Sequence, residues 1–395
     1  MDRATKPRWW EIDGVTPVFA MFFVEAFVLG NWIPRVPDVK SLYQMNATQL
    51  GACLFVLASG TLVSFLAGGK LLKRLGLRTA CCISTPLWSL TICAVPFLPN
   101  TYALAGLLFA AGLSIGILEI AMNTAADRLE RQSGRRLMSK AHGFWSLGSL
   151  VGALVGGGIG GLGIDVSVHF LMVLTATAVV GYLFARNIPK ASSAIKQSQA
   201  NKGEPTFKLP AAGLLLLCLM PIGIMIVEGA FIDWSALFIR DVLAGGALAS
   251  GLVYAAFSTV MAATRLWGDW LLDNFGAQRV ARVSAVAATF GITLFAMSPN
   301  VTVAFIAALF AGLGTAIFYP LTMTEAANRP GDAEDNVSAM SLLAFTSFML
   351  APPLLGAIID HWGLRAALLT IAPLAASSLL LTGELKKDTA HVEND

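Results

Sequence analysis

Residues Gly68 to Gly76 read "GGKLLKRLG", and 200 positions later residues Gly268 to Gly276 read "GDWLLDNFG". Each stretch follows a long apolar segment and keeps its outer glycines and its paired leucines in the same places. Further along, "MNTAADR" at 122–128 is matched by "MTEAANR" at 323–329, an offset of 201. A nearly constant offset over several segments indicates that the chain contains two copies of one structural unit.

The composition around these repeats is that of an integral membrane protein. Of the 395 residues, 56% are hydrophobic and 13% are charged, and the mean hydropathy is +0.70. Soluble proteins carry about 25% charged residues, and a run of about 20 apolar residues is long enough to cross a bilayer as a helix. Such runs recur along the whole chain, which excludes a soluble globular protein. The basic residues lie in short loops, so the net charge of +3 indicates no nucleic-acid partner.

We expect an all-α integral membrane protein with twelve transmembrane helices. The expected spans are 15–34, 47–69, 79–98, 101–126, 141–163, 166–186, 210–236, 246–268, 279–298, 301–326, 337–360 and 364–383. One connection is long and polar and is bracketed by prolines, which is typical of a solvated linker. The chain therefore divides into an N-terminal six-helix bundle at 1–186, a cytoplasmic linker at 187–209 and a C-terminal six-helix bundle at 210–395. Two parallel copies of a six-helix unit form a transporter architecture.

The distribution of positive charge predicts the orientation in the membrane. If both termini lie in the cytoplasm, all but four of the 27 Lys and Arg residues fall on the cytoplasmic side. Cytoplasmic loops are enriched in positive charge, so we expect a multi-pass protein of the bacterial inner membrane with cytoplasmic termini. The first residues, "MDRATKPRWW", are basic and aromatic, and we expect no cleaved signal peptide.

The loop between the second and third spans resembles the signature of the major facilitator superfamily, roughly G-x-L-x-D-R-x-G-R-R. Here it reads "GKLLKRLGLR", in which the glycines, Arg74 and Arg78 match, while Lys73 replaces the aspartate of the family. The usual charge relay of the family therefore cannot form unchanged, although the second copy keeps an acid as Asp273. The resemblance covers essentially the whole chain. It implies a secondary transporter whose two halves provide alternating access to a site near the membrane midplane.

A narrower resemblance comes from "MNTAADRLER" at 122–131 and "LMSKAHGFWSLGSLVGALVGG" at 137–157. These stretches are similar to a bacterial branch that includes the rhizopine transporter MosC and the inner-membrane protein YbjJ, and that is related to fucose–proton symporters. The resemblance implies a polyol, a sugar or an aminocyclitol of rhizopine or inositol type as substrate.

Three acidic residues lie well inside predicted spans: Glu25, Glu119 and Glu228. A charged side chain at the bilayer centre costs about 2.5–3.5 kcal/mol on insertion scales, so such a residue usually faces a cavity or a partner. Trp32 follows Glu25 by seven residues and shares its helix face, where an indole can stack on a sugar ring or an ammonium group. The alternative is that Glu25 bonds to a neighbouring helix and only stabilises packing.

The fourth span places Asn123 one turn after Glu119, on the same helix face. In the fucose symporter, acids in the first and fourth helices serve proton coupling, so the resemblance implies Glu25 and Glu119 as the proton carriers. Because apolar surroundings let a carboxyl group bind and release a proton near neutral pH, the chemistry agrees. A structural ion pair of Glu119 with Lys140 or His142 is the alternative.

In the seventh span, Asp233 follows Glu228 at about 140° around a straight helix, so both cannot face one cavity. We expect Glu228 to bind the ligand, with Trp234 at an outer rim, and Gly229 offers a point of local unwinding. The expected substrate-binding residues are Glu25, Asn31, Trp32, Asn123, Trp145, Glu228 and Trp234.

Charged residues repeat at the cytoplasmic ends of helices in both halves. We expect ion pairs among them to hold the cytoplasmic side closed, with ordinary solvated loop charge as the alternative. The residues are Arg74, Arg78, Asp127, Arg128, Asp269, Asp273, Glu325 and Arg329. In the fifth span, Gly148, Gly152 and Gly156 have the small-xxx-small spacing that lets two helices approach closely.

Other functions are less well supported by the sequence. A multidrug or metabolite exporter for lipophilic cations is the main alternative, because acids and aromatic residues also suit such ligands. The histidines are scattered and the five cysteines lie in apolar runs, so we expect no enzyme, metal site or cofactor. We expect a monomer whose partners are the lipid bilayer, protons and a small-molecule substrate.

Overall fold

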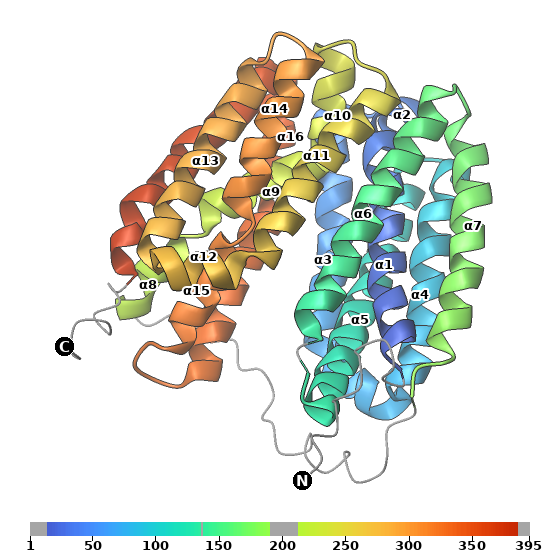
Figure 1. Ribbon diagram of the computed structural model, residues 1–395. Coiled ribbons are helices and arrows are strands. Elements are labelled where there is room, and N and C mark those ends of the chain that lie inside the picture. Colours follow the sequence, from blue (N-terminus) through green and yellow to red (C-terminus); the bar gives the residue numbers. More distant parts are fainter. Residues whose placement is uncertain (1–13, 136, 190–211, 386–395) are drawn as a thin grey trace, which may run out of the picture. The chain divides into compact units, whose positions relative to one another are not determined.

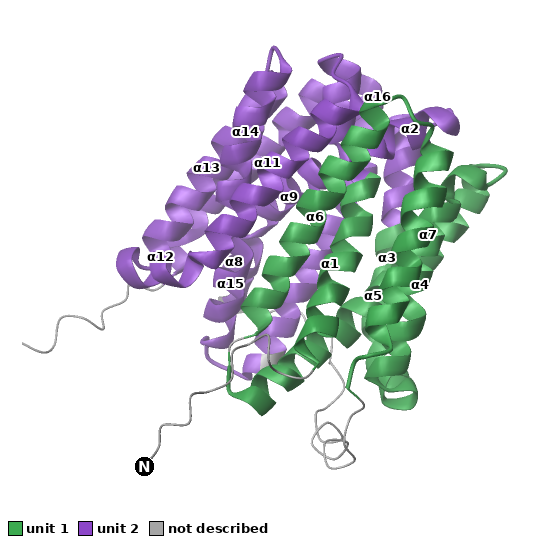
Figure 2. Ribbon diagram, turned by 45° about the vertical axis from the view of Figure 1, so that its right-hand side comes forward, with its two compact units in different colours: residues 1–32, 56–202 green, residues 33–55, 203–395 purple. Residues whose placement is uncertain are grey.

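The computed structural model describes residues 14–135, 137–189 and 212–385, and these form α-helices joined by short turns (Figure 1). Contacts divide the chain into two compact units (Figure 2). Unit 1 comprises residues 1–32 and 56–202, and unit 2 comprises residues 33–55 and 203–395. The predicted basic start of the chain and most of the predicted linker at 187–209 lie outside the described residues.

Unit 1 contains the first six predicted spans apart from the residues at 33–55, and its helices are long because each follows an apolar run. The helices are α1 (Val15–Trp32), α3 (Ala47–Leu75, from residue 56 on), α4 (Leu77–Ala94), α5 (Thr101–Ser133), α6 (Met138–Gly161) and α7 (Val166–Ala185). A short 3-10 turn, η3 (Val95–Phe97), follows α4.

Unit 2 begins with the segment at 33–55, which follows α1 in the sequence but packs with the second half of the chain. This segment holds η2 (Ile33–Arg35), α2 (Val36–Leu42) and the start of α3. The remaining helices are α8 (Ala212–Leu219), α9 (Ile222–Asp233), α10 (Ser235–Leu237), the π-helical turn η5 (Phe238–Val242), α11 (Ala247–Leu266), α12 (Gly268–Phe275), α13 (Ala277–Met297), α14 (Val301–Thr315), α15 (Phe318–Ala327), α16 (Ala333–Leu381) and η6 (Thr382–Glu384).

Among the described residues, eleven helices are long and apolar enough to cross a membrane. The last of them covers 50 residues, and Gly363 lies inside it with a φ of +82°, which is not helical. Two helices therefore meet at this position. Glycine suits it, because a residue with a side chain rarely adopts a positive φ. Counting the two arms of α16 separately recovers the twelve predicted spans, so the predicted fold class is confirmed.

The repeat seen in the sequence also appears in the local structure. The side chain of Asn100 caps α5 by accepting a hydrogen bond from the backbone of Ala103, and Asn300 caps α14 in the same way through Val303. Capping by asparagine satisfies one of the free N–H groups at a helix start. The two halves therefore share the same asparagine cap at an offset of 200 residues.

The seventh span, in unit 2, is interrupted. The seventh span breaks at Met220 and Pro221, between α8 and α9, and turns again at Trp234. The helix is continuous at Gly229, so our expectation of local unwinding at that glycine is wrong. Proline, which cannot donate a backbone hydrogen bond, produces the break instead.

Helices α1 and α6 of unit 1 pack with their backbones in close contact. A Cβ atom added to Gly148 would lie 2.2 Å from the carbonyl oxygen of Phe23, and one added to Gly152 would lie 2.4 Å from that of Phe27. The expected close packing of this glycine-rich helix is confirmed. The contact also determines which side chains of the two helices meet.

Candidate transport site

The carboxylate of Glu25 lies inside unit 1, where α1 meets α6. Its side chain is 1% exposed, and the indole N–H of Trp145 on α6 donates a hydrogen bond to its Oε2 atom. The indole N–H of Trp88 on α4 donates to the backbone carbonyl of Glu25 at 3.1 Å. Two tryptophans from different helices thus fix this turn of α1, one through the carboxylate and one through the backbone.

Glu119 on α5 is the second membrane-embedded acid of unit 1. Asn123, one turn later on the same helix, donates to Glu119 Oε2 at 3.0 Å and to its backbone carbonyl at 2.9 Å. The helices that carry Glu25 and Glu119, α1 and α5, contact each other within unit 1. The structure therefore places in one unit the two acids that the family resemblance implied as proton carriers, and each accepts a hydrogen bond from a neutral side chain.

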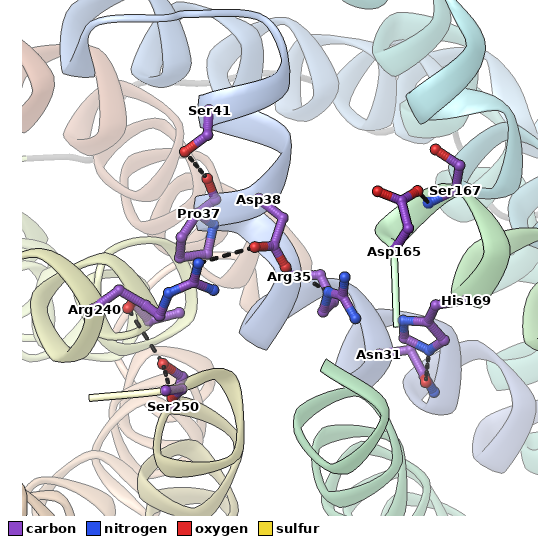
Figure 3. A network of polar contacts seen from close by, with 12 residues as sticks. Asn31, Arg35, Pro37, Asp38, Ser41, Asp165, Ser167, His169, Arg240 and Ser250 are labelled. Atoms are coloured by element: carbon purple, nitrogen blue, oxygen red, sulfur yellow. Dashed lines mark hydrogen bonds and ion pairs between the residues drawn. The ribbon is translucent and has the colours of Figure 1, made fainter. Parts of the chain in front are cut away.

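Asn31 and Trp32 lie in the packed interior at the other end of α1. The amide of Asn31 donates to the carbonyl of Phe27 at 2.8 Å, and its oxygen lies 3.0 Å from Nε2 of His169 on α7 (Figure 3). Trp32 is 5% exposed, and its ring centroid lies 6.3 Å from that of Phe170. These contacts hold α1 against α7, and a substrate-binding role for either residue stays a prediction.

Glu228 of unit 2 has a different kind of partner. The guanidinium of Arg265 on α11 lies 3.5 Å from its Oε1 atom, and the two side chains are 32% and 20% exposed, respectively. Trp234, predicted at an outer rim, is fully buried in unit 2. Asp233 is partly exposed at the end of α9.

Arg265 is a residue of the candidate site that the sequence analysis did not identify. The signal was present, since an arginine inside an apolar span needs a partner as much as an acid does. Its Nε atom donates to the backbone carbonyl of Ala316 at 3.0 Å. His169 was also missed, because its partner Asn31 lies 138 positions away.

Residues 18–348 match the family model described as the Major Facilitator Superfamily. The chain belongs to this superfamily. The uncharacterized transporter y4wD of Sinorhizobium fredii is 30% identical over 94% of this chain and 97% of its own length. The membrane protein MosC of Rhizobium meliloti is 27% identical over 90% of this chain and 86% of its own. A glucose/galactose transporter of Brucella abortus is 24% identical over 90% of each chain.

Solved structures of other transporters share the fold of this Major Facilitator Superfamily protein. A variant of the nucleoside transporter NupG superposes with a TM-score of 0.75 at 14% identity, covering 94% of this chain and 100% of that chain. The fucose–proton symporter FucP of E. coli gives a TM-score of 0.63 at 16% identity, covering 96% and 100%. At such identities the likeness shows the fold alone. Membership of the Major Facilitator Superfamily makes the protein a multi-pass secondary transporter with a small-molecule substrate.

The charged residues predicted at the cytoplasmic gate of this transporter make several contacts within their own units. Arg131 lies 3.0 Å from Asp127, and Arg329 lies 3.2 Å from Glu325 on α15. Arg78 donates to the carbonyl of Ile188 at 2.6 Å. Arg128 is partly buried on α5, whereas Arg74, Asp269 and Asp273 are exposed. A gating role for these eight residues stays a prediction.

The segment at 33–55 is attached to the rest of unit 2 by polar contacts that the sequence did not predict. Arg240 donates to Asp38 at 3.0 Å, and Asp38 also pairs with the buried Arg35 (Figure 3). At the start of α3, the carboxylate of Asp360 accepts hydrogen bonds from the backbone N–H groups of Ala47 and Thr48 at 2.9 and 2.8 Å. An acid at a helix start is stabilised by the free N–H groups and the helix dipole.

A separate groove of unit 1 is almost entirely apolar. It lies among α1, α6 and α7, and Phe19, Phe23, Phe27 and Met172 are among its lining residues. None of the membrane-embedded acids lines it. In the described part of the chain, no group of three or more His, Cys, Asp or Glu side chains is arranged to hold a metal ion.

Proposed function

We propose that this transporter moves a polyol, a sugar or an aminocyclitol of inositol or rhizopine type, and that proton movement drives the transport. In this proposal the protein acts as a monomer in the bacterial inner membrane, with both termini in the cytoplasm. The N-terminal half, at 1–186, carries the proton at Glu25 and Glu119. The C-terminal half, at 210–395, contributes Glu228 to substrate binding.

The observation that carries the proposal is the setting of Glu25. Its carboxylate lies in an apolar span, and the hydrogen bond it accepts comes from the neutral indole of Trp145. A membrane-embedded acid is costly to keep and usually functional. A carboxyl group with neutral donors can exist charged or uncharged in such a setting, so it can bind a proton on one side of the membrane and release it on the other. Glu119 is the second acid that could take up the proton, because the helix that carries it contacts α1.

The polar side chains of the spans support a hydroxylated substrate. Within unit 2, Glu228 and Arg265 offer an acceptor and several donors, which a sugar or polyol needs for its hydroxyl groups. The similarity to a relative named as a glucose/galactose transporter supports the same class.

Export of lipophilic cations is the second candidate, and the apolar groove of unit 1 favours it. The aromatic rings of Phe19, Phe23 and Phe27 would suit an apolar ligand better than a sugar.

Proton flux in proteoliposomes distinguishes these candidates. Purified protein is reconstituted with a pH-sensitive dye inside, and a panel of sugars, inositols, aminocyclitols and lipophilic cations is added outside. We expect a polyol, sugar or aminocyclitol to cause proton movement that is absent from protein-free vesicles. Flux with lipophilic cations alone would support the second candidate, and absence of flux across the whole panel would contradict proton-coupled transport.

A further inference from the structure

The tenth span contains a break with an identifiable chemical cause. Helix α14 ends at Thr315 and α15 begins at Phe318. Pro320 has no backbone N–H, so it cannot bond to the carbonyl of Ala316, which lies four residues earlier. The next helical hydrogen bond runs from the N–H of Leu321 to the carbonyl of Ile317 at 3.0 Å. The carbonyl of Ala316 therefore has no donor from its own helix at that position.

Arg265 supplies the missing donor. Its Nε atom donates to the carbonyl of Ala316 at 3.0 Å, while a terminal nitrogen lies 3.5 Å from Glu228 Oε1. One guanidinium thus connects α11, the junction between α14 and α15, and α9. A free carbonyl in the membrane interior is costly, so this bond stabilises a break that the sequence of the span makes unavoidable.

The same guanidinium leaves Glu228 only loosely paired. At 3.5 Å the contact with Glu228 is long for a charge-assisted hydrogen bond, and both side chains are partly exposed. A ligand hydroxyl can donate to the carboxylate and accept from a remaining N–H of the guanidinium, because arginine has five N–H donors. A lipophilic cation without an acceptor group cannot use both partners. The pair therefore selects for ligands with neighbouring hydroxyl groups.

We propose that Arg265 is a positioning and specificity-determining residue: it bridges the break at Pro320 and, with Glu228, forms a binding pair for a vicinal diol. The part that concerns the ligand rests on the proposed function. The part that concerns the break does not, because it depends only on the contacts within unit 2.

The bridging role is tested without a ligand, by a double-mutant cycle of Arg265→Gln and Pro320→Ala followed by thermal unfolding in detergent. We expect Arg265→Gln to lower the Tm, because glutamine is too short to reach Ala316. Pro320→Ala restores a backbone N–H at the break, so the double variant should recover most of that loss. Additive effects of the two substitutions would overturn the bridging role.

Arg365→Gln is the matched control for this cycle. The guanidinium of Arg365 also donates to backbone carbonyls, those of Ala296 and Ser298, at 2.7 and 2.9 Å. Its loss should lower the Tm as well, but Pro320→Ala should not rescue it. Rescue of both arginine variants would show that Pro320→Ala stabilises the protein generally, which would also overturn the bridging role.

The binding role is tested with myo-inositol, D-glucose and tetraphenylphosphonium as probes in equilibrium binding. We expect Arg265→Gln and Glu228→Gln each to weaken the binding of the hydroxylated probe by about tenfold, the factor that corresponds to one good polar contact. Unchanged affinity of both variants would overturn the pair and the binding role of Glu228, while leaving the proposed substrate class and proton coupling untouched. Binding of tetraphenylphosphonium alone to the parent protein would overturn both the proposed substrate class and the selectivity of the pair. The bridging role of Arg265 would still be tested by the double-mutant cycle of thermal unfolding.

Discussion

In the first half of the chain, Glu25 accepts a hydrogen bond from the indole of Trp145, and Glu119 accepts one from the amide of Asn123. In the second half, Glu228 faces the guanidinium of Arg265. The offset of 201 that relates the two halves places Pro320 where the first half has Glu119. The repeated scaffold therefore holds Glu25 and Glu119 with neutral donors in one half, and Glu228 with a cation in the other.

This difference suits two different tasks. A carboxylate beside a cation stays charged, because losing the charge would leave the cation without a partner. A carboxyl group with neutral donors can take up or lose a proton at a smaller electrostatic cost. On the proposed function, the first half carries the proton and the second half binds the substrate, and each prediction below tests that division.

The largest contrast is expected from carbodiimide labelling, because dicyclohexylcarbodiimide reacts with protonated carboxyl groups in apolar surroundings. We expect labelling at Glu25 and little at Glu228, read by mass spectrometry of the digested protein. Arg265→Gln should allow Glu228 to be labelled, since the guanidinium that lies 3.5 Å from its carboxylate is then gone. Strong labelling of Glu228 in the parent protein would contradict the division.

The packing that positions Trp145 against Glu25 should be sensitive to a single methyl group. Gly152→Ala places a Cβ atom 2.4 Å from the carbonyl oxygen of Phe27, and this backbone cannot move without moving α1. We expect a loss of about 1–3 kcal/mol in the free energy of unfolding, the usual cost of overpacking. Gly229→Ala is the control in unit 2, because its Cβ atom would meet only the ring of Phe348 at 3.2 Å. Equal losses in the two variants would show that the contact between α1 and α6 is not specially tight.

A smaller effect is expected when only the indole donor is removed. Trp145→Phe keeps an aromatic ring on α6 but removes the hydrogen bond to the carboxylate of Glu25. We expect proton-driven uptake to fall by about tenfold, equivalent to about 1.4 kcal/mol. Trp88→Phe removes the other indole donor, which serves the backbone carbonyl of Glu25. It should lower the Tm with little effect on the coupling of uptake to protons, and similar transport defects in both variants would contradict a special role for the carboxylate bond.

Much of the scaffold could be predicted from the sequence, because long apolar runs and a repeat leave few alternatives. The spans, the repeat and the close packing at Gly148 and Gly152 all follow from local patterns. The break at Pro320 could also have been expected from proline chemistry. The division at residue 33 could not, because it depends on contacts such as that of Asp38 with Arg240, 202 positions away.

The partners of the acids were the least predictable part of the site. Nothing near Glu25 in the sequence indicates that Trp145, 120 positions away, donates to its carboxylate. The spacing along α1 predicts that Glu25 and Trp32 share a helix face, whereas the structure places Trp32 against Phe170. Spacing along one helix shows which side chains share a face, but the neighbouring helix decides which of them meet a partner.

The division of tasks is tested most directly by comparing Glu25→Gln and Glu228→Gln in two assays on the same proteoliposomes. Proton-driven uptake requires both a proton carrier and a binding site, whereas counterflow at equal pH requires only the binding site. We predict that Glu25→Gln abolishes driven uptake and keeps counterflow, and that Glu228→Gln impairs both. Loss of counterflow in Glu25→Gln, or driven uptake that survives in it, would contradict the account.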